Sequence, residues 1–173
     1  MNYITLYHLI FVVKIKNNMR VCILGSGLTS LALAKALVNQ KIYVDIFFQP
    51  KISMISKTRT IGISKSNVQF FNENIINIEK IIWKLNKIDI FSENLVNEDV
   101  IKFEDNSEYL FSIVRNYKLY ENLIKSLNNN KFFKKRKFNQ NMIIHKYNLV
   151  INTDNYNFIT KRYFSKKILK KYN

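Results

Sequence analysis

The chain has 173 residues, a length that predicts one domain with a substantial hydrophobic core. Hydrophobic residues make up 47% of the sequence, with only 3 glycines and 1 proline, which excludes a disordered or low-complexity protein. The single cysteine, Cys22, excludes a disulfide framework within the chain and fits a reducing cytoplasm.

The net charge of +16 is concentrated toward the C-terminus. From position 131 onward there are 12 Lys and Arg residues and one acidic residue, which leaves 16 basic and 11 acidic residues, of 28 and 12, for the first 130 positions. An excess of basic residues is one indication of nucleic-acid binding. However, Asn, Ile, Lys and Tyr are frequent throughout, as in AT-rich coding sequences, so we attribute part of the lysine excess to nucleotide composition.

Residues 1–18 form an extension ahead of the first expected strand. The apolar run over 4–13 is too short to span a bilayer, and it lacks the flanking features of a secretory signal. Met19 directly precedes the expected strand, so we expect Met19 to be the true start of the protein. A weak anchor at the membrane surface is the alternative interpretation of this extension.

The stretch over 20–37 carries the strongest local pattern. An apolar run over 21–24 predicts a strand, Gly25 and Gly27 predict a tight turn, and the Ala/Leu-rich continuation predicts a helix. This order directs backbone N–H groups and a helix N-terminus at a phosphate. Ser30 stands in place of the third glycine of a G-x-G-x-x-G fingerprint, a position that governs how closely the helix packs on the strand.

The nearly apolar segment 42–48 predicts a parallel strand that is buried on both faces, and it completes a βαβ unit. Dinucleotide-binding proteins carry an acidic residue about twenty positions after the glycines, where it binds the ribose. Asp45 lies too early for this role, and Phe48 stands at the expected spacing. Only the neutral Gln49 beside it is placed to form a hydrogen bond there.

The remaining chain alternates between helical and strand-like patterns. We expect helices over 66–74, 78–85 and 117–127, and we expect the segment 59–64 to return to the core. We expect short strands over 87–103, further strands over 108–114 and 147–153, and a basic helical tail over 161–171. The helix over 117–127 has a stripe that we expect to face the core: Leu119, Tyr120, Leu123, Ile124 and Leu127. The basic, Phe-containing segment 131–137 predicts a solvated surface segment, although such runs also contact single-stranded nucleic acid.

The sequence assigns no catalytic residue and no metal site. Cys22 lies inside the first expected strand, where we expect a small buried side chain and not a nucleophile. His8 and His145 are isolated, so neither predicts a catalytic or metal-ligating group.

Four segments occur in order along the chain: Val-Cys-Ile-Leu-Gly-Ser-Gly-Leu-Thr-Ser-Leu-Ala-Leu-Ala over 21–34, Arg-Thr-Ile-Gly-Ile-Ser over 59–64, Val-Arg-Asn-Tyr-Lys-Leu over 114–119 and Leu-Val-Ile-Asn-Thr-Asp over 149–154. The first is similar to an N-terminal FAD fingerprint, and the others are similar to Arg-x-x-x-Leu-Ser, Val-x-Asn-x-x-Leu and a strand ending in Asp-Gly. In order and spacing they resemble the FAD-dependent aromatic hydroxylases of the p-hydroxybenzoate hydroxylase type, most closely their ubiquinone-biosynthesis branch.

The resemblance implies an α/β fold: a Rossmann-like FAD-binding domain with a parallel sheet and part of a small β-rich insertion from the substrate domain. It places the FAD-binding domain at 19–160, the insertion at about 86–114 and a basic tail at 161–173. The family's later Gly-Asp motif has no counterpart after position 161. The chain therefore looks like the N-terminal part of a hydroxylase, and we expect little turnover from it alone.

The resemblance also implies a set of cofactor-binding residues. Backbone groups from Gly25 to Ser30 would hold the FAD pyrophosphate, Arg59 would lie near the flavin, Asn116 would hydrogen-bond the cofactor, and Asp154 would serve the second dinucleotide motif. Asn155 replaces the glycine that follows the aspartate in that motif. The full set, with Gln49 in place of the ribose-binding acid, is Gly25, Ser26, Gly27, Leu28, Thr29, Ser30, Gln49, Arg59, Asn116 and Asp154.

The chemistry implied by the resemblance is ring hydroxylation, with FAD as cofactor, NAD(P)H as co-substrate and an aromatic or polyprenyl-phenol substrate. A cytoplasmic location fits this chemistry, with peripheral contact at the inner face of the membrane as a further option. The main alternative is a non-catalytic basic module that contacts nucleic acid or anionic membrane through 131–171, of which we favour nucleic acid least. A nicotinamide-dependent dehydrogenase is a third hypothesis, which the Arg59 and Asn116 segments do not suit.

Overall fold

The computed structural model describes residues 19–48, 56–91, 99–104, 108–139, 146–154 and 157–163. Some sequence predictions concern residues outside these ranges: the extension over 1–18, Gln49, His145, Asn155 and most of the basic tail.

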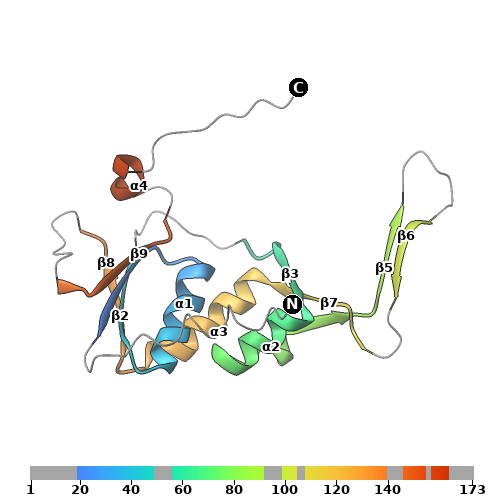
Figure 1. Cartoon of the computed structure of the whole chain (residues 1–173), viewed down its shortest axis with the longest axis horizontal. Helices are drawn as coiled ribbons and strands as arrows, with labels where there is room; N and C mark the ends of the chain where they lie inside the picture. The colour runs from blue at the N-terminus through green and yellow to red at the C-terminus, as the bar shows by residue number, and fades with distance from the viewer. Residues whose placement is uncertain are drawn as a thin grey trace, which may run out of the picture.

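A four-stranded parallel sheet contributes side chains to both buried clusters of the described core (Figure 1). Its strand order is β8-β2-β1-β9, and each pair of neighbours runs parallel. The strands are β1 (Arg20–Leu24), β2 (Tyr43–Phe48), β8 (Phe133–Lys137) and β9 (Leu149–Asn152). This sheet confirms the predicted α/β class.

The helices α1 (Leu28–Asn39) and α3 (Asn116–Asn128) pack against each other and cover one face of the sheet. The buried side chains of the strands meet those of the helices in one cluster, which includes Val21, Ile23, Val44, Ile46, Leu31, Ala34, Leu119, Leu123 and Leu127. The predicted core-facing stripe of α3 is therefore confirmed, with Tyr120 and Ile124 partly buried at its border.

The opposite face of the sheet buries Cys22, Leu24 and Phe47. The side chains that pack against them are Phe138, Tyr147, Val150 and Ile159. Because β2 is covered on both faces, its nearly continuous apolar sequence is explained. Full burial of the Cys22 side chain confirms the prediction that it is a small core residue.

An antiparallel sheet with the order β3-β7-β4 lies beside the helices, and a separate hairpin of β5 and β6 extends away from it (Figure 1). The antiparallel sheet consists of β3 (Thr60–Ser64), β4 (Ile82–Leu85) and β7 (Phe111–Arg115). The hairpin consists of β5 (Lys87–Phe91) and β6 (Asp99–Glu104). Helix α2 (Lys65–Asn74) directly follows β3, and the Ser64 hydroxyl accepts a hydrogen bond from the backbone N–H of Asn67 as its N-cap.

The helix predicted over 78–85 is wrong. A single 3₁₀ turn, η2 (Glu79–Ile81), is followed by strand β4, which pairs antiparallel with β7. A short apolar run fits helix and strand equally well by periodicity. Pairing with a strand that lies far away in the sequence decides the outcome here.

The basic side chains of the surface segment predicted over 131–137 are exposed, as expected, but the prediction missed that Phe133–Lys137 forms β8, the edge strand of the described parallel sheet. The Phe133 side chain is buried, and the four basic residues after it are exposed. β8 therefore completes the sheet with backbone hydrogen bonds to β2. Its charged side chains are of the kind that discourages pairing with a further strand.

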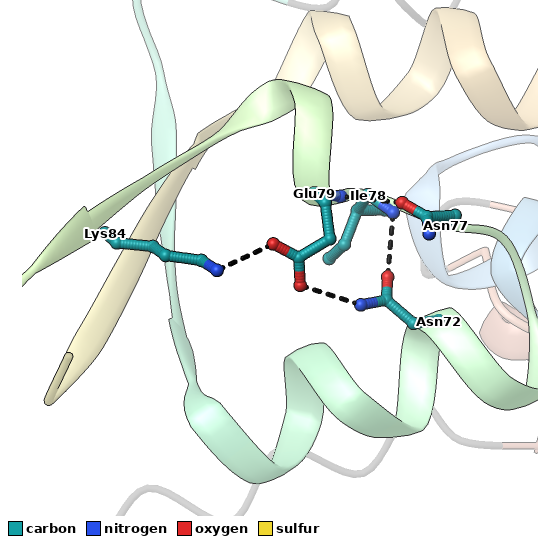
Figure 2. Close-up of polar contacts among 5 residues, drawn as sticks. All are labelled: Asn72, Asn77, Ile78, Glu79 and Lys84. Carbon is teal, nitrogen blue, oxygen red and sulfur yellow. Dashed lines mark hydrogen bonds and ion pairs between the residues drawn. The ribbon is translucent and has the colours of Figure 1, made fainter. Parts of the chain in front are cut away.

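A polar network fixes the connection between α2 and β4 (Figure 2). Asn72 Oδ1 accepts a hydrogen bond from the Ile78 N–H at 2.8 Å, and Asn72 Nδ2 donates to Glu79 Oε1 at 3.0 Å. Glu79 Oε2 lies 2.8 Å from Lys84 Nζ, and the Glu79 N–H donates to Asn77 Oδ1 at 3.0 Å. The network therefore links the end of α2 to the start of β4.

The last described helix, α4 (Phe158–Tyr163), follows β9 and begins before the predicted basic tail. Among the helices within the described ranges, none is long and apolar enough to cross a membrane.

Candidate cofactor-binding site

The turn after β1 requires glycine at position 25. Gly25 has a φ of +121°, a conformation that residues with a side chain rarely adopt. A Cβ at this position would collide with Thr153 Oγ1 and would lie 3.1 Å from Ser30 Oγ. The Gly25 N–H donates to the Phe47 carbonyl at 2.9 Å, so the turn is also tied to β2. Conformation and space both exclude a larger residue.

Gly27 meets a different environment: apart from its chain neighbours, no atom of the described residues would lie within 4 Å of a Cβ there. Gly27 is the N-cap residue of α1, and no described side chain caps the helix. The first turn of α1 contains no acidic residue. The first N–H groups of a helix have no partner within the helix, and they attract anions. The start of α1, including Ser26, Leu28 and Thr29, thus offers open space and unpaired donor groups to a phosphate.

The Ser30 side chain points into the protein and not toward this open space. Ser30 is 1% exposed, and its Oγ lies 2.6 Å from Thr153 Oγ1. Thr153 Oγ1 donates to the Leu24 carbonyl at 2.9 Å, so the Ser30 hydroxyl donates to Thr153. Only the backbone N–H of Ser30 is therefore suited to bind a phosphate.

Asp154 lies beside the glycine turn, with its Cβ 3.4 Å from where a Gly25 Cβ would be. Its backbone is held at both ends: the Asp154 N–H donates to Asn152 Oδ1 at 3.1 Å, and the Asp154 carbonyl accepts from Thr160 Oγ1 at 2.7 Å. The structure thus brings together two segments that are far apart in the sequence, and both were predicted to contact the cofactor.

Sequence reasoning missed the residues that shape the turn after β9. Asn157 is 1% exposed, donates to Asn152 Oδ1 at 2.6 Å and accepts from the Thr160 N–H at 2.9 Å as the N-cap of α4. The Asn152 amide also donates to Thr160 Oγ1 at 2.7 Å. The run of Asn, Thr and Asp residues after an apolar strand was the available indication, because these side chains favour turns and caps.

Arg59 and Asn116 are neighbours in space, since the Asn116 N–H donates to the Arg59 carbonyl at 3.0 Å. Asn116 begins α3, and only residues 129–132 separate the end of α3 from β8. The end of α3 therefore lies at the amino edge of the parallel sheet, and its start lies toward the carboxyl edge, where Gly25 is found. The Asn116 Oδ1 atom is buried and has no hydrogen-bond partner among the described residues.

The usual ribose-binding carboxylate has no equivalent at the end of β2. Phe48 lies there, its carbonyl accepts from the Phe138 N–H at 2.9 Å, and Lys135 Nζ lies 4.8 Å from the centre of its ring. Asp45 is engaged elsewhere: its Oδ2 accepts from Arg136 Nε at 2.9 Å and from the Tyr147 hydroxyl at 2.7 Å. Any ribose contact at this strand end is therefore made without a carboxylate from β2.

The ionisation of Cys22 agrees with its core position. Burial, with a smaller effect of the Asp45 charge, raises the pKa of the Cys22 thiol to about 12. The thiol is protonated at neutral pH and is not a nucleophile. Among the described residues, no group of three or more His, Cys, Asp and Glu side chains could hold a metal ion.

The sequence matches no protein-family model, and no curated protein is significantly similar to it. Solved structures are similar to it in fold. PqsL, a probable FAD-dependent monooxygenase from Pseudomonas aeruginosa, matches 91% of this chain with a TM-score of 0.65 and 9% identity. p-Nitrophenol 4-monooxygenase PnpA from Pseudomonas putida DLL-E4 matches 69% with a TM-score of 0.57 and 13% identity. HpxO from Klebsiella pneumoniae, complexed with FAD, matches 68% with a TM-score of 0.53 and 14% identity.

These similarities show that the chain has the fold of flavin-dependent monooxygenases. The chain spans 48% of PqsL, 32% of PnpA and 31% of HpxO, so it matches less than half of each of these proteins. The fold favours the flavoprotein hypothesis over the basic-module alternative, because part of the basic segment forms strand β8 of this sheet.

Proposed function

We propose that this chain is the FAD-binding part of a flavin-dependent monooxygenase that hydroxylates an aromatic ring. The observation that carries the proposal is the turn at Gly25 and Gly27. It combines a φ that favours glycine, open space at Gly27 and an uncapped helix start without acidic residues. The similarity in fold to a protein complexed with FAD supports FAD as the ligand.

The residues present suit FAD at most positions. Backbone N–H groups at the start of α1 would hold the pyrophosphate, aided by the helix dipole. Asp154 would act from beyond the end of β9, Asn116 from the start of α3 and Arg59 from just before β3. The buried Asn116 Oδ1 has no hydrogen-bond partner among the described residues. Phe48, whose ring contacts the Lys135 ammonium group, occupies the place of the ribose-binding carboxylate. We therefore expect weaker FAD binding than in a site that has this carboxylate.

When bound, FAD would supply the redox chemistry, with NAD(P)H as reductant and O2 as the source of the oxygen atom. This chain would bind and orient the cofactor. Catalytic acid–base groups are not assigned to it. We therefore expect little turnover without the parts of the fold that PqsL and PnpA have and this chain does not match.

Two solved relatives support an aromatic substrate: one is named a p-nitrophenol 4-monooxygenase, and PqsL has been solved in complex with 2-aminobenzoylacetate. We further propose a polyprenyl-phenol of ubiquinone biosynthesis as the substrate, a domain over 19–160 with its insertion at about 86–114, and a location in the cytoplasm with peripheral contact at the membrane. These finer proposals depend on the four-segment resemblance.

Two substitutions of Gly27 provide a sharp test. Asp and Asn are both favourable N-cap residues, so Gly27→Asp and Gly27→Asn should leave the melting temperature unchanged or raise it. The carboxylate of Gly27→Asp would repel a bound pyrophosphate at the helix start. We therefore expect Gly27→Asp to weaken FAD binding at least tenfold more than the neutral Gly27→Asn, which serves as the matched control.

The measurement is an FAD titration of the purified full chain, followed by flavin fluorescence, at a temperature well below unfolding. The proposal is overturned if the unsubstituted protein does not bind FAD. It is also overturned if both variants bind FAD as tightly as the unsubstituted protein, because the pyrophosphate would then lie away from this turn.

A further inference from the structure

Beside the glycine turn, a hydrogen-bonded pair of hydroxyl groups joins three segments of the chain. Ser30 on α1 and Thr153 directly after β9 are 123 positions apart, and their Oγ and Oγ1 atoms lie 2.6 Å from each other. Both the Oγ1 and the N–H of Thr153 donate to the carbonyl of Leu24, the last residue of β1, each at 2.9 Å. Helix α1, strand β1 and the end of β9 therefore meet at one point.

The contacts of Thr153 orient the peptide group between Leu24 and Gly25, with which the turn begins. The Leu24 carbonyl and the Gly25 N–H belong to the same peptide group. Thr153 binds its carbonyl oxygen, and the Phe47 carbonyl binds its N–H at 2.9 Å. Because Thr153, directly after β9, binds one side of this peptide group and Phe47 of β2 binds the other, the orientation of the peptide at the start of the turn is fixed.

We propose that Ser30 and Thr153 are positioning residues that set the glycine turn against Asp154. A third glycine at position 30 would allow close packing of α1 without any polar group. Ser30 instead brings a hydroxyl that is 1% exposed and needs a partner, and Thr153 provides it. The effect of a substitution at position 30 on stability should thus depend on the residue at position 153, and the reverse. The expected effect on FAD affinity rests on the proposed function.

The dependence can be measured in the ligand-free protein with a double-mutant cycle. Thr153→Val keeps the shape of the side chain, removes the hydroxyl and leaves Ser30 without its partner. We expect it to lower the melting temperature by about 3–6 °C. In a Ser30→Ala background the same substitution should lower it by less than half as much. Equal losses in the two backgrounds would overturn the proposed coupling.

The positioning role is tested by the FAD dissociation constant, measured well below unfolding. We expect Thr153→Val to raise it about tenfold and Thr153→Ser, which keeps a hydroxyl, to restore most of the affinity. Ser126→Ala is the matched control, because among the described residues the Ser126 hydroxyl bonds only to the Leu123 carbonyl of its own helix. A lower melting temperature with unchanged FAD affinity would overturn the positioning role.

The two experiments, the thermal double-mutant cycle and the FAD titration, separate this inference from the proposed function. If the unsubstituted protein binds no FAD, the proposed function and the positioning of FAD both fail, and the thermal cycle alone decides whether the hydroxyls are coupled. If FAD binds and Thr153→Val changes neither the melting temperature nor the FAD affinity, the inference fails and the proposed function stands.

Discussion

At the scale of single residues, the two glycines of the turn have different reasons to be glycine. Gly25 lies in a backbone conformation that excludes side chains and faces Thr153, Ser30 and Asp154. Gly27 has an ordinary backbone conformation, and no described residue other than its chain neighbours comes within 4 Å of where its Cβ would be. The fold therefore demands the first glycine, and a ligand is the reason we propose for the second.

Gly25→Ala should destabilise the protein by about 2–4 kcal/mol, because it combines backbone strain with a collision against Thr153. Gly27→Ala should cost less than about 1 kcal/mol, the scale of a weaker N-cap. Urea unfolding of both variants, followed by circular dichroism, measures the difference. Equal losses would contradict the distinct roles of the two positions.

At the scale of elements, short polar side chains determine where helices and strands begin. Asn72 and Glu79 link the end of α2 to the start of β4 (Figure 2), and Asn157 caps α4 directly after β9. A strand or helix whose apolar pattern is ambiguous is placed by such contacts and by pairing with a neighbouring strand.

The contribution of the Glu79–Lys84 pair should depend on pH. The hydrogen bond with Lys84 lowers the pKa of Glu79, and the same bond raises the pKa of Lys84. The stabilisation linked to Glu79 is therefore present above its unfolded pKa of about 4.3 and is lost as the pH falls through the lowered folded value. The part linked to Lys84 is lost only at alkaline pH, as the pH rises through the raised pKa of Lys84.

Glu79→Gln should therefore lower the melting temperature at pH 7, and the gap to the unsubstituted protein should close below about pH 4. Thermal unfolding at a series of pH values measures this gap. Lys84→Met is the control, since combining it with Glu79→Gln should add little at pH 7. A gap that stays constant in acid would show that the ion pair does not contribute.

At the scale of the whole molecule, residues predicted to contact the cofactor gather toward one edge of the parallel sheet. Gly25 and Asp154 lie next to each other there, and the start of α3 carries Asn116 toward the same edge. Parallel strands connected through helices place the helix starts at the carboxyl ends of the strands, which is where ligands of open α/β sheets bind.

Saturating FAD should raise the melting temperature of the whole chain. At one hundred times its dissociation constant, a ligand of the folded state stabilises by about 2.7 kcal/mol, which corresponds to roughly 5–10 °C for a protein of this size. Thermal unfolding with and without FAD measures the shift. Riboflavin at the same concentration is the control, because it lacks the pyrophosphate and should give a much smaller shift.

The parts that could be predicted from the sequence are those encoded by local patterns. The apolar runs of β1 and β2, the glycine turn and the helical stripe of α3 each follow from residue spacing over a few turns or a single strand. The ordered motifs also indicated Gly25, Asn116 and Asp154 as parts of one site. The similarity to solved monooxygenase structures supports the predicted α/β fold.

The other features could not be predicted, because pairing between distant segments overrides local preference. Residues 82–85 form a strand because they pair with β7, and the basic run after Phe133 forms a strand because it pairs with β2. The Ser30–Thr153 hydroxyl pair joins residues 123 positions apart, and no local pattern encodes it. Local patterns in the sequence thus predict a glycine turn between a strand and a helix of an α/β fold, and contacts between distant segments hold that turn in place.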